Sequence, residues 1–290
     1  MPARPRPTVR LRRLAGILRR LRAEKGLSRE DVLEATGINK ATLSRIENIK
    51  VRPQARTLAT LLDLYGVEPD ERKVLMQLLK DSSQSGWWQA YTDELPPVYE
   101  SFIEFEDEAS SVWNYESLFV PGLLQTEDYV RALVRGVLPG ADREEVDQRV
   151  EVRLKRQAVL SRDQPLRFWA ICDEAALHRV VGSSTIMRDQ LLHLLSAMDR
   201  PTITFQVVPY DAGSHPGMPG SFMVLRFDDN PSVIYVDSMA GDLFIEDEAD
   251  VHRYSNTYEY LRAVALSPDA TMQLLTRTAA TYERGGTGDG

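Results

Sequence analysis

The first eighty residues repeat a helical period of apolar positions, interrupted by short polar turns. Apolar residues recur at spacings of three and four, and the pattern predicts five helices, over about residues 9–25, 29–36, 40–48, 57–65 and 70–80. Gly26, Gly37 and Gly66 follow the first, second and fourth segments, where a left-handed residue commonly ends a helix. Ser28 and Asn39 precede the second and third, as N-cap residues do. We therefore expect an all-α domain of five helices.

The pattern changes after the polar stretch "DSSQSG" at residues 81–86. Runs rich in β-branched and aromatic residues predict strands at 166–173, 202–210, 221–227 and 232–238. Helical periods predict helices at 126–135, 142–162, 174–181, 185–198 and 250–265. Because the later strands follow one another without intervening helices, we expect an α+β domain with a mostly antiparallel sheet.

These changes of pattern suggest the domain boundaries. Residues 1–80 form the predicted helical domain, residues 81–95 a linker, and residues 96–282 an effector or partner-binding domain. The Gly-rich residues 283–290 are expected to be a disordered tail.

Charge is distributed unevenly over this plan. The whole chain has a net charge of -8, yet residues 1–56 contain 15 Lys and Arg against 5 Asp and Glu, so residues 57–290 carry a net charge of -18. A basic block confined to one end is typical of a surface that meets phosphates. A single cysteine, Cys172, and the lack of an apolar run of about 20 residues favour a cytoplasmic protein that does not enter a membrane.

The second and third predicted helices are short and are joined by a turn that contains Gly37. Two such helices, the second with polar residues on its outer face, have the geometry of a helix-turn-helix that reads the major groove. The stretch "LSREDVLEATGINKATLSRIENIKVRPQARTLATLLDLYGV" resembles the five-helix DNA-binding domain of the Xre/Cro repressor family. The likeness extends over about residues 8–80.

This resemblance implies roles for individual residues. Positions that face base edges in the family are matched by Lys40, Ala41, Ser44 and Arg45. Positions near phosphates are matched by Arg29, Asn39, Thr42, Asn48 and Lys50. The chemistry agrees, since an arginine can fork onto guanine and an alanine methyl group can touch thymine. Arg22 and Glu47 match a family ion pair between the first and third helices.

Two residues depart from the family pattern. Ile49 stands where glycine is common after the recognition helix, and Arg29 replaces the usual glutamine. The conformation of the loop after the third helix is therefore an open question.

The basic leader offers two readings. Arg4 and Arg6 are separated by prolines and cannot pack a core. They could lie along a phosphate backbone or in a minor groove as a DNA arm, or the leader could be a disordered tail when DNA is absent.

A second resemblance covers about residues 99–279. Its motifs include "ESLFVPGLLQTEDYVRAL", "RLKRQAVL", "CDEAALHRVVGS" and "YEYLRAVALSPDAT". They are similar to a C-terminal domain of unknown function found behind Xre-type domains in actinobacterial regulators, the WhiJ-like group. The resemblance implies a nucleoid-associated transcriptional regulator, antitoxin-like, that acts with a small BldB-like companion protein. A homodimer on double-stranded DNA and a possible small-molecule ligand fit the same scheme.

Two alternatives belong to other classes. An enzyme could use Glu174 and His178, four residues apart, with His193, His215 or His252. No complete set of metal ligands or catalytic partners appears at a recognised spacing, so we expect no enzyme, no cofactor and no metal site. Alternatively, the basic helices bind an acidic protein, and the chain regulates transcription indirectly without specific DNA binding.

Overall fold

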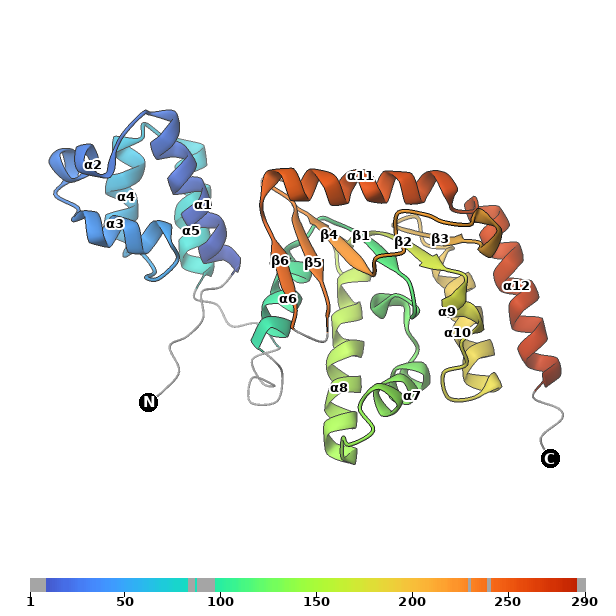
Figure 1. Ribbon diagram of the computed structural model, residues 1–290. Coiled ribbons are helices and arrows are strands. Elements are labelled where there is room, and N and C mark those ends of the chain that lie inside the picture. The colour runs from blue at the N-terminus through green and yellow to red at the C-terminus, as the bar shows by residue number, and fades with distance from the viewer. Residues whose placement is uncertain (1–8, 83–86, 88–96, 229–230, 239–240, 286–290) are drawn as a thin grey trace. The chain divides into compact units, whose positions relative to one another are not determined.

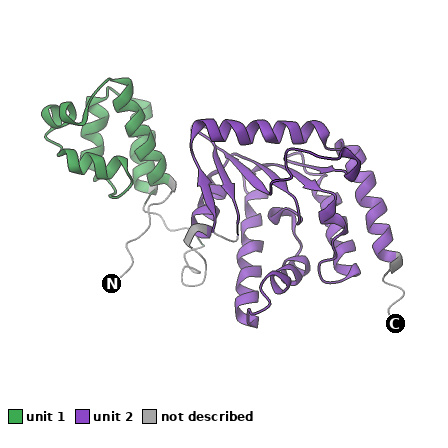
Figure 2. Cartoon of the chain, viewed as in Figure 1, with its two compact units in different colours: residues 1–90 green, residues 91–290 purple. Residues whose placement is uncertain are grey.

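The computed structural model describes residues 9–82, 87, 97–228, 231–238 and 241–285. The chain divides into two compact units, Met1–Ala90 and Tyr91–Gly290, shown in separate colours in Figure 2. The division falls inside the segment predicted as a linker.

Unit 1 is all-α, and the predicted five-helix domain is confirmed. Its helices, labelled in Figure 1, are α1 Val9–Glu24, α2 Arg29–Thr36, α3 Lys40–Glu47, α4 Ala55–Leu64 and α5 Pro69–Asp81. Leucines from four of them meet in one core with Val32, Ile46 and Tyr65. Burying these apolar side chains is what holds such short helices together, since isolated helices of this length are marginal in water.

Unit 2 combines a sheet with helices. It begins with α6 Pro97–Glu108, β1 Ser111–Glu116, α7 Glu127–Val137, α8 Arg143–Arg156, β2 Arg167–Asp173, α9 Ala175–His178 and α10 Ser184–Ala197. It continues with β3 Ile203–Val208, β4 Phe222–Arg226, β5 Val233–Val236, β6 Leu243–Ile245, α11 Glu248–Val264 and α12 Pro268–Gly285. Short 3-10 turns occur at Gly122–Leu124, Gln157–Leu160 and Tyr210–Ala212.

Within the described residues the strands form one six-stranded sheet, in the order β3-β2-β1-β4-β5-β6. The pairs β1–β4, β4–β5 and β5–β6 are antiparallel, whereas β1–β2 and β2–β3 are parallel. The predicted α+β class with a mostly antiparallel sheet is thus confirmed. The parallel part arises where helices separate successive strands, because a parallel pair needs a long crossover connection.

The two faces of the sheet are covered differently. Tyr258 and Leu261 of α11 pack on one face, against Tyr115 of β1 and Phe222 of β4. Side chains alternate along a strand, so Asn114 and Glu116, which flank Tyr115 on β1, point to the opposite face of the sheet. On that opposite face the ring of Phe102 from α6 stacks on Tyr235 of β5, with 4.0 Å between ring centroids.

Several elements differ from the sequence-based expectation. The expected helix at 142–162 ends at Arg156 and gives way to the 3-10 turn Gln157–Leu160, and the expected helix at 174–181 is only Ala175–His178. The patterns did not predict α6, α12, β1 or β6, and α12 runs to Gly285, into the predicted tail. The strand β1 contains Asn114, a residue that is uncommon in strands, and β6 is only three residues long.

Among the described residues, no helix is both long enough and apolar enough to cross a lipid bilayer.

Candidate nucleic-acid interface

Local capping sets the geometry of the helix pair α2–α3. The Ser28 hydroxyl accepts from the Asp31 backbone N–H at 3.1 Å, and the Asp31 carboxylate accepts from the Ser28 N–H at 2.7 Å, which completes a capping box. Gly37 ends α2 with φ 72°, a left-handed conformation that favours glycine. Asn39 then caps α3 by accepting from the Ala41 N–H at 2.8 Å. The predicted turn residues therefore begin and end the helices as expected.

The inner face of α3 fixes which of its residues reach the surface. Leu43, Ile46 and Glu47 are buried. Lys40, Ala41 and Arg45 are exposed, and the remaining polar residues of the helix are half-buried. A helix brings residues four apart onto one face, so the predicted base-reading residues form two neighbouring pairs, Lys40 with Ser44 and Ala41 with Arg45.

Two of the base-reading candidates, Lys40 and Arg45, form contacts with other residues of α2 and α3. The Lys40 ammonium forms an ion pair with Glu30, and its hydrogen bond lowers the pKa of the Glu30 carboxyl. Arg45 lies along its own helix, where Nε donates to the Ala41 carbonyl at 3.2 Å and Nη2 to the Thr42 hydroxyl at 3.4 Å. These contacts are exposed and weak, so base edges can replace them at small cost.

The phosphate-binding candidates gather around both ends of α3. Asn39 stands at its start, with Thr42 one turn further on, and Asn48 ends it by donating from Nδ2 to the Ser44 carbonyl at 2.8 Å. Lys50 is exposed in the loop that follows, and its backbone N–H donates to the Arg45 carbonyl at 2.7 Å. The predicted arm residues Arg4 and Arg6 lie outside the described residues.

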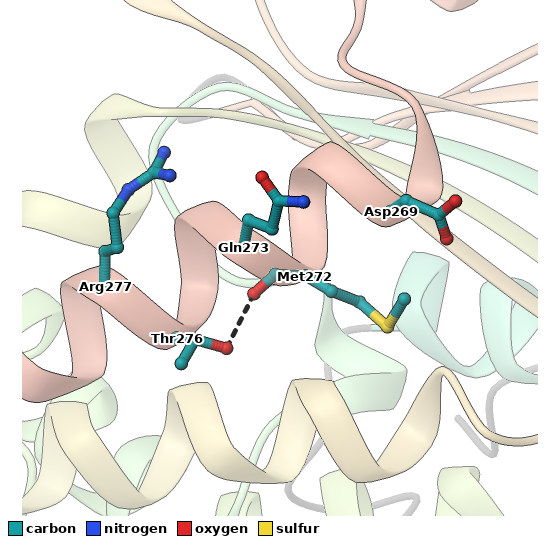
Figure 3. Close-up of a pocket in the computed structure, with 5 residues that line it drawn as sticks. All are labelled: Asp269, Met272, Gln273, Thr276 and Arg277. Atoms are coloured by element: carbon teal, nitrogen blue, oxygen red, sulfur yellow. Dashed lines mark hydrogen bonds between the residues drawn. The ribbon is translucent and has the colours of Figure 1, made fainter.

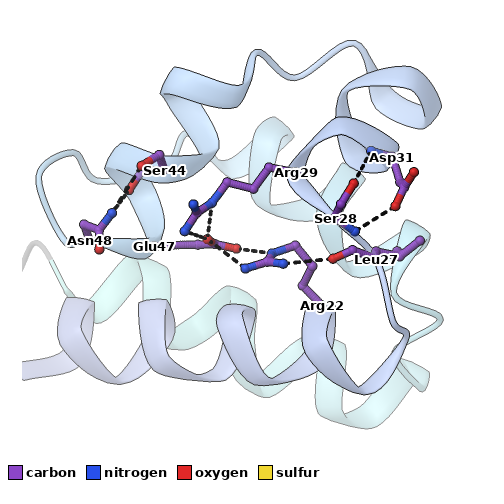
Figure 4. A network of polar contacts seen from close by, with 8 residues as sticks. All are labelled: Arg22, Leu27, Ser28, Arg29, Asp31, Ser44, Glu47 and Asn48. Carbon is purple, nitrogen blue, oxygen red and sulfur yellow. Dashed lines mark hydrogen bonds and ion pairs between the residues drawn. The ribbon is translucent and has the colours of Figure 1, made fainter.

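A buried carboxylate ties the recognition helix to the rest of unit 1 (Figure 4). Glu47 has no exposed surface, and it accepts from Arg22 Nε at 2.6 Å and Nη2 at 3.2 Å. The same arginine donates from Nη1 to the Leu27 carbonyl at 2.8 Å. The hydrogen bond with Glu47 raises the pKa of Arg22. The ion pair implied by the family resemblance is therefore present.

Arg29 adds a second cation to this carboxylate, which the sequence did not reveal. Its Nε donates to Glu47 Oε2 at 2.9 Å, and 39% of its side chain remains exposed. An arginine carries five N–H donors in a planar fork, so the contact leaves donors free for a second partner. Glu47 consequently orients Arg29 at the N-terminus of α2, where backbone N–H groups also favour phosphate. The only sign of this contact in the sequence was that Arg29 stands where the family usually has glutamine.

The backbone conformation of the loop after α3 is set at Ile49. Ile49 has φ 61°, so it adopts the left-handed conformation in place of the family's glycine. A β-branched residue is strained there. Arg52 holds the following segment by donating from Nε to the Ser82 hydroxyl at 3.0 Å, and Pro53 is buried.

Comparison with protein families agrees with this geometry. A helix-turn-helix domain matches residues 13–75, and a domain of unknown function, DUF5753, matches residues 99–277, more than half of the chain. The chain belongs to the DUF5753 family. No curated protein and no solved structure matches it. It is thus a helix-turn-helix protein with a DUF5753 domain, and the helix-turn-helix indicates DNA binding.

Glu174, His178 and His215, three of the side chains considered for catalysis, lie in the DUF5753 domain close to the segment that follows β3. Glu174 contacts His178 at 3.2 Å and also accepts from the Tyr210 backbone N–H at 2.8 Å. Asp173 contacts His215 Nε2 at 3.3 Å. Both carboxylates thereby tie the segment after β3 to the end of β2. In the described part of the chain no group of three or more His, Cys, Asp and Glu side chains is arranged to hold a metal ion.

Proposed function

We propose that this protein is a sequence-specific, DNA-binding transcriptional regulator of the Xre type. The observation that carries the proposal is the construction of α3: its inner face is fixed by Leu43, Ile46 and Glu47, while Lys40 and Arg45 stand exposed on its outer side. A rigid short helix with exposed donors is what readout in the major groove requires. The net charge of +10 on residues 1–56 supports the same conclusion.

The regulatory scheme extends this proposal. One short recognition helix contacts few base pairs, so a homodimer on a near-palindromic operator supplies the affinity. The DUF5753 domain is then the controlling part, engaged by a small BldB-like, antitoxin-like companion or by a ligand, as in the WhiJ-like regulators of actinobacteria. We infer a cytoplasmic, nucleoid-associated protein without catalytic activity. A coupling between companion and DNA must act equally in both directions.

The test distinguishes sequence-specific base readout from non-specific electrostatic binding to DNA. Arg45→Ala is expected to weaken binding to the operator by about 1–3 kcal/mol and to leave binding to random DNA nearly unchanged, because a base contact specifies. The operator is found first by mapping bound DNA across the genome, and affinities are then measured by fluorescence anisotropy at fixed salt.

A matched control uses an arginine away from α3. Arg72 on α5 forms an ion pair with Asp63, and Arg72→Ala is expected to change neither affinity. Equal losses on operator and random DNA for Arg45→Ala would contradict base readout. Such a result would favour the alternative, a protein-interaction module that regulates transcription indirectly.

A further inference from the structure

The last turn of α5 ends on carbonyl groups that the helix itself leaves without donors. The final four carbonyl oxygens of an α-helix have no partner N–H within the helix. In α5 the carbonyl of Leu79 accepts from the Ser82 hydroxyl at 2.7 Å and also from Nη2 of Arg52. Ser82 follows α5 directly, where the chain leaves the five-helix bundle for unit 2, and only 5% of it is exposed. A residue from elsewhere in unit 1 therefore helps to satisfy the end of α5.

Arg52 reaches this turn from the loop after α3, 30 positions earlier in the chain. Its Nε donates to Ser82 Oγ at 3.0 Å, while its Nη2 and the same hydroxyl donate to the Leu79 carbonyl. A planar guanidinium can serve two acceptors at once in this geometry, which the ammonium of a lysine cannot reproduce. Hydrogen bonds from a charged donor are also stronger than those between neutral groups. The network therefore fixes one end of the loop on α5.

The other end of the loop is fixed on α3. The Lys50 and Val51 N–H groups both donate to the Arg45 carbonyl, at 2.7 and 3.3 Å, and the Ile49 N–H donates to the Ile46 carbonyl at 3.0 Å. Ile49 itself has φ 61°, a left-handed conformation that is strained for a β-branched residue. Such a conformation persists only when the surrounding structure determines it strongly. The bonds at both ends of the loop supply that determination.

The loop carries two of the predicted phosphate-binding residues, Asn48 and Lys50. Both are exposed. A flexible loop must be ordered when it binds a phosphate backbone, and the lost conformational entropy lowers the affinity. A loop whose backbone is already fixed avoids this loss.

We propose that Arg52 is a positioning residue for DNA binding, which holds the loop after α3 through the last turn of α5. A change in that turn, where the chain leaves the bundle for the DUF5753 domain, then alters the affinity for DNA without any change in α3. This inference rests on the proposed function, because phosphate contacts by the loop presuppose DNA binding. It deepens that function by naming the contact that links the end of unit 1 to the DNA interface.

A direct phosphate contact by Arg52 is the alternative role for an exposed arginine in this unit. Two substitutions distinguish the roles. Arg52→Lys keeps the positive charge but removes the planar fork, and Ser82→Ala removes the acceptor on α5 without changing any charge. Direct contact predicts that both variants keep nearly the affinity of the wild type, whereas positioning predicts that both lose affinity.

The affinities are measured by fluorescence anisotropy on the full-length protein at fixed salt, with the operator and with a random-sequence duplex. Arg52→Lys and Ser82→Ala are each expected to weaken binding about two- to tenfold, the range that corresponds to one net hydrogen bond. The loss should be about equal on both DNAs, because phosphate contacts do not specify sequence. Circular dichroism checks that each variant is folded. Wild-type affinity in both variants would overturn the proposal.

A matched control removes a hydroxyl of the same kind from unit 2. Thr276 of α12 donates from Oγ1 to the Met272 carbonyl at 2.8 Å, as Ser82 does to Leu79. It belongs to an open pocket on that helix, which is lined by Asp269, Met272, Gln273, Thr276 and Arg277 (Figure 3). Thr276→Ala should leave the affinity for both DNAs unchanged. A loss as large as that of Ser82→Ala would overturn the assignment of a specific role to the Arg52 network.

Hydrogen exchange without DNA tests the loop itself. The backbone amides of Lys50 and Val51 report on the loop, and the amide of Gly37 at the end of α2 is the reference. In both variants the loop amides should exchange about fivefold faster relative to the reference, because only the loop is released. A general loss of stability would speed all three amides alike and, like unchanged exchange, would contradict the positioning role.

The two measurements separate this inference from the proposed function. If the wild type bound neither DNA, the proposed function would fail, and with it the effect of Arg52 on affinity. The exchange comparison would still decide whether Arg52 holds the loop. If the wild type bound DNA and both variants matched it, only the positioning role would be overturned.

Discussion

Glu47 in unit 1 and Glu116 in unit 2 are both carboxyl groups drawn away from bulk water, but their surroundings differ. Glu47 is fully buried, and two arginines, Arg22 and Arg29, donate to it. Glu116 is half-buried, and the charge of Asp237 next to it has the same sign as its own. Two opposite charges and several hydrogen bonds compensate the burial of the Glu47 carboxylate. Glu116 accepts hydrogen bonds from Asn114 and Ser221, but burial nevertheless raises its pKa to about 7.

The difference is not a property of the two units as wholes. Unit 2 also contains a compensated carboxylate, Glu106, which accepts from Arg156 Nε at 2.8 Å and Nη2 at 2.7 Å. Arg156 lies over the ring of Phe102 and donates to the Tyr99 hydroxyl at 2.6 Å. The same domain can therefore pair a buried carboxylate with an arginine. The raised pKa of Glu116 is therefore an effect of its own surroundings within the domain.

The largest expected effect comes from removing the compensated acid. Glu47→Ala leaves Arg22 without its partner and loosens α3, so unit 1 should lose about 3–5 kcal/mol of unfolding free energy. Hydrogen exchange of unit 1 amides in the full-length protein measures the loss. Glu30→Ala, which removes an exposed carboxylate paired with Lys40, is the control and should change little. A loss no greater than that of the control would contradict the anchoring role of Glu47.

Glu116 should respond in the opposite direction. The native pKa of Glu116, about 7, lies above its unfolded value, so the native state binds an extra proton between about pH 4 and pH 7. Stability of the wild type therefore falls as pH rises through that window and stays low above it. Glu116→Gln abolishes this dependence and should stabilise the protein by about 1–3 kcal/mol at pH 8. Urea unfolding of wild type and variant at pH 5 and pH 8 measures both the pH dependence of stability and the stabilisation at pH 8. Identical pH dependence in variant and wild type would count against the raised pKa.

Strain beside the compensated acid should give a smaller effect. Ile49 lies two residues beyond Glu47 in the left-handed region, which costs a β-branched residue about 1–2 kcal/mol, while glycine has an entropic cost of its own. Ile49→Gly is thus expected to raise the melting temperature, by an amount equivalent to about 0.5–1 kcal/mol. Ile49→Ala, which keeps a Cβ, should stabilise less. Equal stabilities of the two variants would show that the conformation of the loop is not the cause.

The smallest expected change in stability concerns the second cation of Glu47. Arg29 is partly exposed and Arg22 remains in Arg29→Gln, so we expect a loss of about 0.5 kcal/mol. Affinity should fall about equally on operator and random DNA, because a phosphate contact positions without specifying. Anisotropy titrations with both DNAs test this. Unchanged binding to both would remove Arg29 from the phosphate contacts.

Local signals in the sequence predicted much of unit 1. Ser28, Gly37 and Asn39 begin and end their helices through contacts within a few residues, so their roles can be read without a tertiary structure. The same holds for Leu43 and Ile46, which helical spacing places on the inner face of α3. The base-reading and phosphate-binding assignments remain predictions, and they depend on a family resemblance in addition to the pattern.

The rest depended on contacts between residues far apart in the chain. Arg29 and Glu47 are 18 positions apart, and no periodicity links them. The strand β1 was missed because its Asn114 disfavours a strand locally, whereas its place between β2 and β4 supplies two partners for its backbone. Local propensity is a weak force, and tertiary pairing overrides it.

The sequence by itself determined the two-part organisation, the charge asymmetry, the helix boundaries of unit 1 and the class of unit 2. Those properties follow from composition and from interactions within one or two turns of chain. Only the tertiary structure decided that Glu47 has two cations and that Glu116 has an acidic neighbour. The ionisation of a buried carboxyl depends on the groups within a few ångströms of it, and those groups come from helices and strands that only folding brings together.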